Sequence, residues 1–419
     1  MVVSGRADGE GQSDLSAREP VDPALALLLG QLFDRNVRFP NRPAFVPDVD
    51  VFEMPDGLGF QFRGFEAPVL VRGRLAGRVV TYLRSCLDGQ TSVESVLREA
   101  PSDIPPAALV RSLLLLHSKG VLVPAEPEAS EGGAAAMAPT VIDAETLDRQ
   151  LLYWGRHLAI TRSAGSAAEV TRRLALARVV VVGTGMFGVV TADLLARSGF
   201  HQQQVLAWND DGMMERNLSN SPAGPTVFHR LTTTGVDQAL DVLRDWCDAA
   251  DLIVTATCDA PSALFRGIND VSLRARVPWL YGNADASAID IGPLVQPYES
   301  ACYACVEARR RSAEEFPIEH ELYEDHLASE RDARERVVMG EAVWPATLAA
   351  SMLVGEACRF ISGLSAATLV DTALRVLPIS GTIETNRVSR VPRCPSCFRG
   401  EIPPADISTW SFAPVDAVG

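Results

Sequence analysis

Lysine is almost absent from this chain: Lys119 is the only one among 38 basic residues, and arginine supplies the rest. The 53 acidic residues outnumber them and leave a net charge of −15. Sequence-independent binding to nucleic acid depends on cationic side chains that displace counterions from phosphates. We therefore expect no nucleic-acid partner.

Long apolar runs are also missing. Stretches such as ARVVVVGTGMFGVV reach glycines well short of the roughly 20 residues that span a membrane. The first residues are polar and acidic and lack the apolar centre of a secretory signal. Eight cysteines without such a signal favour a reducing compartment, where paired thiols bind metal more often than they form disulfides. We expect a soluble, cytoplasmic protein with no membrane association.

Four of the cysteines form two Cys-x-x-Cys pairs, Cys302 with Cys305 and Cys394 with Cys397. Each pair can hold two corners of a tetrahedral zinc site with little strain. The long interval between the pairs argues against a self-contained zinc ribbon, so a metal would clamp distant parts of one domain. Four thiolates leave no open coordination position, and the predicted Zn²⁺ is therefore structural.

Composition and periodicity divide the chain into four parts. They are a partly disordered arm over 1–48, a small domain over 49–125, a linker over 126–142 and an α/β domain over 143–419. In the small domain, three β-like runs precede three helical patterns and the run VLVP, which is the order of a winged helix. Ser92 is expected to cap the second helix, and Gly120 to end the third.

Winged helices most often bind DNA, but this segment has only scattered arginines and no basic recognition helix. LDGQTSVESVL followed by LLLLHSKGVLV resembles the precursor-peptide recognition element of ribosomal-peptide biosynthesis. That resemblance implies that a leader peptide is captured as an added strand on a sheet edge. The residues it implies for the groove, on the edge strand and the third helix, are Val69, Leu70, Val71, Arg72, Val110, Ser112, Leu113 and Leu116.

The segment ARVVVVGTGMFGVVTADLLARSGF predicts a buried strand, a Gly-x-Gly-x-x-Gly turn and a helix. Gly183, Gly185 and Gly188 would let main-chain N–H groups and the helix N-terminus approach phosphate oxygens. Alternatively, the glycines only permit close packing of strand and helix. The hypothesis that the protein is an NAD(P)-dependent oxidoreductase rests on this motif alone, and it leaves the paired cysteines unexplained.

Two later strands end in polar residues. QQVLAWND leads to Asn209, Asp210 and Asp211, and DLIVTATCD places Cys258 and Asp259 at a carboxyl end, where ligands of open α/β sheets gather. A nucleophilic role for Cys258 is conceivable, although the apolar run IVTATC favours simple packing. The three remaining cysteines are expected to be core residues: Cys86, Cys247 and Cys358.

The ordered combination of these motifs resembles the ThiF-like adenylating superfamily, relatives of the ubiquitin-activating enzymes. It comprises the glycine turn, an acidic turn ending in Asn217-Leu218, Asp259 with Arg266 and Asn269 after it, and the two cysteine pairs. VPWLYGN, IGPLVQP, ACYACVEARR and VPRCPSC resemble one branch, the ThiF-like partner of azoline-forming cyclodehydratases. The resemblance implies two partners, a precursor peptide and a YcaO-type cyclodehydratase of thiazole/oxazole-modified peptide and thiopeptide biosynthesis. We also expect a homodimer.

The same resemblance implies an ATP site in which Asp259 holds Mg²⁺. Asp259 would be a catalytic residue only if the protein adenylates a substrate. The implied nucleotide-binding residues are Gly183, Gly185, Gly188, Asp210, Asp211, Asn217 and Asp259. SAEEFPIEHELYEDHLASERDARER, over 312–336, predicts a charged, solvated helix; in a second interpretation it lines the opening where a peptide or partner enzyme docks.

Three positions depart from active members of that superfamily. Asn209 stands where a ribose-binding Asp is expected, and Asn220 stands where an Arg meets the triphosphate. Residues 219–250 contain no lysine, which leaves His229, Arg230 and Arg244 as cations. Loss of one preorganised donor or cation costs about 3 kcal/mol of transition-state stabilisation. We therefore predict a degenerate ATP site; the alternative is an active ATP-dependent enzyme that adenylates a peptide carboxylate.

Overall fold

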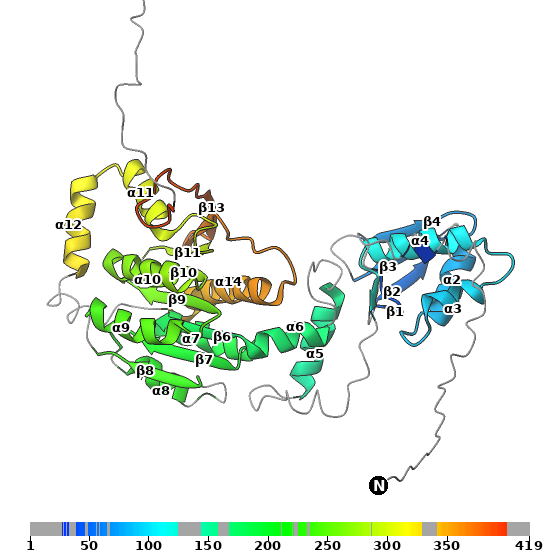
Figure 1. Cartoon of the computed structure of the whole chain (residues 1–419), viewed down its shortest axis with the longest axis horizontal. Coiled ribbons are helices and arrows are strands. Elements are labelled where there is room, and N and C mark those ends of the chain that lie inside the picture. The colour runs from blue at the N-terminus through cyan, green and yellow to red at the C-terminus, as the bar shows by residue number, and fades with distance from the viewer. Residues whose placement is uncertain are drawn as a thin grey trace, which may run out of the picture. The chain divides into compact units, whose positions relative to one another are not determined.

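The structure is a computed structural model that divides into two compact units, Met1–Glu126 and Pro127–Gly419 (Figure 1). The described residues are 27, 29, 30, 32, 39–46, 49–55, 57, 59–64, 68–124, 144–157, 167–210, 212–219, 221, 225–232, 235–285, 287–328 and 342–399. Asp211, Asn220, the predicted linker 126–142 and 36 of the 48 residues of the predicted arm lie outside them.

The N-terminal unit contains a three-stranded antiparallel sheet in the order β2-β3-β4, so β4 lies at one edge. These strands are β2 (Asp50–Glu53), β3 (Gly59–Arg63) and β4 (Val69–Arg72). A second, two-stranded sheet pairs β1 (Pro43–Phe45) with β5 (Leu122–Pro124). The helices between β4 and β5 are α2 (Ala76–Cys86), α3 (Val93–Arg98) and α4 (Pro106–Ser118). From β2 to β5 the strands and helices follow one another in the predicted order, whereas β1 lies within the expected arm 1–48 and was not predicted. The winged-helix assignment stays a prediction.

Local signals in the sequence fix the ends of these helices. Ser92 Oγ accepts a hydrogen bond from Ser95 N at 3.2 Å, which satisfies one of the open N–H groups at the start of α3. Gly120 follows α4 with φ +75°, a conformation that favours glycine. The three helices cover one side of the small sheet through a core that includes Phe62, Leu83 and Leu109.

The second unit is built on one eight-stranded sheet in the order β13-β12-β11-β10-β9-β6-β7-β8. Strands β8, β7, β6, β9 and β10 run parallel, and β11, β12 and β13 continue the sheet antiparallel. Their bounds are β6 (Arg178–Gly183), β7 (Gln202–Ala207), β8 (Val227–Arg230), β9 (Leu252–Cys258), β10 (Trp279–Ala284), β11 (Ile289–Val295), β12 (Thr372–Leu377) and β13 (Thr382–Arg387). The central strand β6, read as RVVVVG, is buried after its first residue, as expected for a parallel strand covered on both faces.

Helices cover both faces of this sheet (Figure 1). Leu240, Phe265 and Tyr303, from α9, α10 and α11, share one core with the sheet, and α14 packs on the other side against α6 and α7. The helices of this unit are α5 (Ala144–His157), α6 (Ala167–Leu176), α7 (Gly185–Arg197), α8 (Met213–Ser219), α9 (Val236–Cys247), α10 (Ser262–Ala275), α11 (Tyr303–Ala313), α12 (Pro317–Ala328) and α14 (Val343–Ser362). None of the helices in the described part is both long and apolar enough to cross a membrane.

A buried carboxylate anchors the long helix α14 to the loop that follows it. Glu356 is fully buried, and its Oε1 accepts a hydrogen bond from Leu369 N at 2.6 Å. Its Oε2 accepts hydrogen bonds from Thr368 Oγ1 and Arg359 Nε, both at 2.9 Å. Such a group is stable in the interior only because each of its oxygens is satisfied.

Replacing Glu356 by alanine should therefore destabilise the second unit by about 3 kcal/mol, because a main-chain N–H and a guanidinium lose their acceptor. All six tryptophans lie in this unit, so urea unfolding followed by tryptophan fluorescence reports on it alone. D241A, which removes an exposed ion-pair partner on α9, should stay within about 0.5 kcal/mol of the parent. Equal effects of the two substitutions would contradict the anchoring role.

Candidate functional site

The glycine turn after β6 is explained in part by packing. A Cβ at Gly183 would lie 2.9 Å from Gly188 Cα and 2.9 Å from Met214 Cε, and one at Gly188 would lie 2.8 Å from Met214 Cε. Real Cβ atoms do not approach other atoms so closely, so both positions must be glycine for β6, α7 and α8 to meet. Gly185 has φ +57° at the first residue of α7. The packing alternative therefore accounts for two of the three glycines.

The turn after β7 carries a buried carboxylate with one unused oxygen. Asp210 is 4 % exposed; its Oδ1 accepts a hydrogen bond from Met214 N at 3.1 Å, and its Oδ2 has no partner among the described residues. Asn209, before it, has φ +50° and is half-buried. Asn217 donates from Nδ2 to Met213 O at 2.8 Å, within α8. Among the described residues of the acidic turn, Asp210 thus carries an unsatisfied acceptor.

Two guanidinium groups meet at the same turn. A Cβ at Gly212 would lie 2.9 Å from Arg216 Nη1 and 3.2 Å from Arg230 Nη1, and Arg230 also pairs with Glu215. Arg216 was not identified from the sequence, although it lies one helical turn after Gly212 and its N–H donates to Gly212 O. The other two candidate cations are engaged elsewhere: His229 packs against Trp246, and Arg244 pairs with Asp241.

Asp259 lines a cavity of about 210 Å³ at the carboxyl ends of β9 and β10. It has φ +48°, and its N–H donates to Ala284 O at 2.8 Å. Cys258 is opposite Ala284 in the register of the two strands, so Asp259 and Asp285 follow the ends of neighbouring strands and line the same cavity. Sequence reasoning missed Asp285; the only signal was its place just after the strand WLYGNA.

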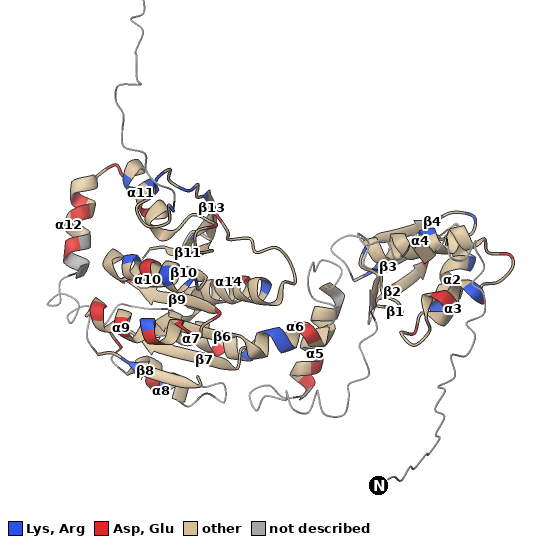
Figure 2. Ribbon diagram, in the orientation of Figure 1, with Lys and Arg blue, Asp and Glu red and all other residues tan. Residues whose placement is uncertain are grey.

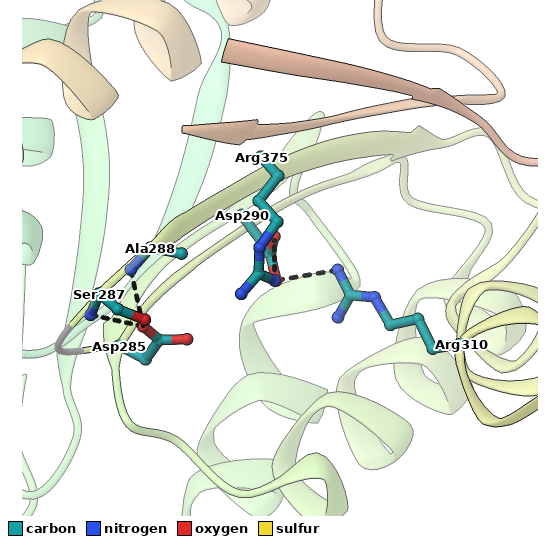
Figure 3. Close-up of polar contacts among 6 residues, drawn as sticks. All are labelled: Asp285, Ser287, Ala288, Asp290, Arg310 and Arg375. Carbon is teal, nitrogen blue, oxygen red and sulfur yellow. Dashed lines mark hydrogen bonds and ion pairs between the residues drawn. The ribbon is translucent and has the colours of Figure 1, made fainter. Parts of the chain in front are cut away.

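Hydrogen bonds fix the carboxylate of Asp285, which lines that cavity (Figure 3). Its Oδ1 accepts from Ser287 N and Ala288 N, both at 2.7 Å, and from Ser287 Oγ at 2.9 Å.

Asp290, on β11, pairs with Arg310 at 2.9 Å and with Arg375 at 3.3 Å. One carboxylate thus joins α11 and β12 to β11 and fixes this side of the sheet.

Arg266 and Asn269 do not face the glycine turn. Arg266 Nε donates to Glu307 Oε1 at 2.8 Å, and Asn269 Oδ1 accepts from Tyr303 N at 2.9 Å. Asn269 is 1 % exposed, so this contact is a core one. Both residues join α10 to the start of α11.

The four paired cysteines converge at one point in the core. Their sulfur atoms all lie within 4.8 Å of one another. The Sγ atoms of Cys302 and Cys305 are 3.9 Å apart, and those of Cys302 and Cys394 are 3.7 Å apart, as are those of Cys305 and Cys397. Tetrahedral zinc with Zn–S bonds of about 2.3 Å requires sulfurs about 3.8 Å apart. The donor set and its spacing therefore fit a structural Zn²⁺.

The surroundings of the cluster favour thiolate at one of its members. The Cys302 thiol and the Val391 N–H both donate toward Cys305 Sγ, which lowers the pKa of Cys305 to about 4, while the shared hydrogen bond raises that of Cys302. Burial has the opposite effect on two cysteines outside the cluster, since it raises the pKa of Cys247 and of Cys358 to about 12. Those two are inert core thiols, as the sequence predicts.

The residues predicted for the peptide groove divide between surface and core. On β4, Val69 and Val71 are buried, whereas Leu70 is 48 % exposed and Arg72 is exposed. On α4, Ser112 is half-buried, but three of the predicted residues belong to the hydrophobic core and are at most 1 % exposed: Val110, Leu113 and Leu116. Leu115 is the exposed leucine of that helix, at 38 %.

The helix α12 corresponds to part of the predicted charged segment, and residues 329–336 lie outside the described ones. The coloured ribbon of Figure 2 marks acidic residues along α12 and basic residues on the neighbouring α11. Ile318 and Leu322 of α12 are 71 % and 65 % exposed, so its surface is apolar as well as acidic.

Comparisons with known proteins find likeness in structure only: no model of a known protein family and no curated protein matches the sequence. The microcin C7 biosynthetic enzyme MccB, solved with N-formylated MccA, has a TM-score of 0.62 at 17 % identity, covering 85 % of this chain and 99 % of MccB. MccB of E. coli solved with ATP gives 0.60 at the same identity and coverage. The heterocyclase TruD gives 0.51 at 18 % identity, and the match covers 85 % of this chain but 43 % of TruD. The chain thus has the fold of MccB, which confirms the α/β class predicted from the sequence.

The cysteine geometry predicts about one zinc ion per purified chain, measurable by elemental analysis. Cys394→Ser should abolish that stoichiometry and red-shift the tryptophan fluorescence, because the second unit loses its clamp. Cys86→Ser, in the N-terminal unit, is the matched control and should keep the zinc. Full zinc retention by Cys394→Ser would show that the cluster does not hold the metal.

Proposed function

We propose that this protein binds the leader of a ribosomally synthesised precursor peptide and presents the peptide to a YcaO-type cyclodehydratase for azoline formation. The N-terminal unit, a winged-helix recognition element in this proposal, would hold the leader. The second unit would carry the partner enzyme and a degenerate ATP site. The protein would act in the cytoplasm as a homodimer and belong to thiopeptide or related antibiotic biosynthesis.

The fold supports this proposal at a coarse level. MccB is a microcin C7 biosynthetic enzyme and was solved with the peptide MccA, and TruD is a heterocyclase. Both names concern the modification of peptides, and the sequence motifs resemble the same kind of pathway. The likeness to TruD covers 85 % of this chain and 43 % of TruD.

The single observation that carries the peptide-binding role is the edge strand β4. Among the described strands it has one neighbour, β3, so one side of its main chain is available to an added strand. Leu70, on its exposed face, offers apolar contact area, while Val69 and Val71 anchor the strand in the core. The groove contacts would then come from Leu70, Arg72, Ser112 and Leu115, and the buried leucines of α4 would support them.

The nucleotide site has mixed features. The unpartnered Oδ2 of Asp210 is an acceptor that a ribose hydroxyl could satisfy, and an unsatisfied buried acceptor costs about 1–3 kcal/mol. Arg216 and Arg230 are cations near the same turn. Met214, however, packs against Gly183 and Gly188, and the sequence lacks the lysine of active relatives. We infer that ATP, if it binds, is not turned over efficiently, and that Asp259 would be the residue to hold Mg²⁺.

The peptide-binding proposal predicts that Leu70→Glu weakens leader binding by tenfold or more, because burial of a leucine side chain contributes about 1.5–3 kcal/mol. The measurement is fluorescence anisotropy with the full chain and labelled leader peptides of short Cys/Ser-rich precursors from the same genome. Phe52→Glu is the matched control, since Phe52 is 53 % exposed on β2 at the opposite edge of the same sheet. Equal loss in both variants would exclude β4 as the docking edge.

ATP–pyrophosphate exchange distinguishes the scaffold from the alternative, an adenylating enzyme that acts on a peptide carboxylate. The scaffold predicts exchange near background with the precursor peptide present, and no further change in Asp259→Ala. Robust exchange that Asp259→Ala abolishes would make the protein an adenylating enzyme instead.

A further inference from the structure

A groove beside the four-cysteine cluster is lined on its polar side by arginines. It has a volume of about 730 Å³ and lies between the turn at Tyr298 and the segment that carries the second cysteine pair. Arg390, Arg393 and Arg399 line it, and no acidic residue of the described chain does. In a protein with a net charge of −15, such a concentration of uncompensated positive charge needs an explanation.

Stacking on an aromatic ring orients one of these arginines. Arg399 Cζ lies 3.4 Å from the centroid of the Tyr298 ring. This contact uses the flat face of the guanidinium and leaves the N–H groups of its edge to bind a planar acceptor such as a carboxylate. Tyr298 has φ +67°, which is rare for an aromatic residue, so the surrounding turn holds the ring against the backbone preference.

Charge compensation at the metal site explains one of the three arginines that line the groove. Zinc with four thiolates has a net negative charge, which a nearby arginine can offset. Arg390 does so: its Nη2 donates to Cys397 O at 3.1 Å and lies 4.0 Å from Cys397 Sγ. Arg393 and Arg399 are exposed, and neither forms an ion pair within the described residues. These two arginines are the unexplained ones.

The apolar surface between the arginines indicates the kind of ligand. Phe398 is 38 % exposed in the groove, and Pro392 and Val391 line it as well. A free phosphate ion would use the guanidinium groups and leave this surface in water. An extended peptide that alternates acidic and apolar side chains would use both.

We propose that this groove binds a carboxylate-rich peptide segment of another molecule, through Arg393 and Arg399 with apolar contacts to Phe398. The site lies in the second unit and does not depend on the leader-binding role of β4. It would give the protein a second peptide contact, specific for acidic sequence.

The test uses the full, zinc-loaded chain and a fluorescein-labelled peptide of glutamates interrupted by leucines, followed by anisotropy. R393Q/R399Q should weaken binding by about tenfold or more, because two charge-assisted contacts are lost. R172Q/R274Q removes the same charge from two exposed arginines of the same unit and should bind as the parent does. A peptide with glutamine in place of glutamate should not bind, and added salt should weaken the glutamate peptide.

Equal binding by the two double variants, or by the glutamine peptide, would overturn the proposal. Inorganic phosphate that displaced the labelled peptide better than unlabelled peptide did would show an anion site instead, and would also overturn it. If R393Q/R399Q lost zinc, R393K/R399K would decide, because lysine keeps the charge but not the bidentate fork. Unchanged binding in that variant would be equally contrary to the proposal.

Discussion

The convergence of four buried sulfurs is the contact on which the far side of the large sheet depends. Strand β13 is exposed at every residue, so little apolar burial of its own holds it in place. It is fixed by its ladder to β12 and by the chain that runs on to Cys394 in the core. On the other side of the cluster, Cys302 caps α11, whose Tyr303 N–H is bonded to Asn269. A metal there would therefore fasten α10, α11 and the last two strands in one step.

The predicted motif residues of this unit have two kinds of role: some serve packing, and others are open to a ligand. The motif residues Gly183, Gly188 and Asn269 serve packing, because each is in contact with core atoms. Asp259, by contrast, follows the end of β9 in a cavity, in a left-handed conformation that carries a cost of about 1–3 kcal/mol. Strain is tolerated where a side chain must point out of the sheet. The sheet thus leaves Asp259 in a cavity, while two of the three motif glycines are used for packing.

The strongest sequence patterns were those with a physical reason to be local. The apolar run RVVVVG predicts a buried strand, which is β6. Two Cys-x-x-Cys pairs in one domain predict that the four sulfur atoms lie together, as they do. The face of α4 could not be read in the same way. Its four consecutive leucines offer no polar position to mark the solvent side, so Leu113 and Leu116 were assigned to a groove although they belong to the core. Met214, Asp285 and Arg216 were missed because their place at the site depends on residues from other segments. Met214 packs against Gly183, Asp285 shares a cavity with Asp259, and Arg216 lies near Arg230 at Gly212. Periodicity in the sequence does not reveal such contacts.

Charge links the two peptide sites that we propose. A surface with a net charge of −15 repels acidic peptides, and the repulsion reaches about 8–10 Å at physiological salt. An acidic segment can dock only where guanidinium groups are concentrated and acidic neighbours are missing. The groove at Arg393 and Arg399 meets that condition among the residues that the structure describes. In this proposal the β4 edge would work differently, because main-chain hydrogen bonds do not discriminate by charge and the exposed Leu70 would favour apolar side chains. A peptide with an apolar leader and an acidic segment would engage both sites at once, and its affinity would exceed that of either part alone.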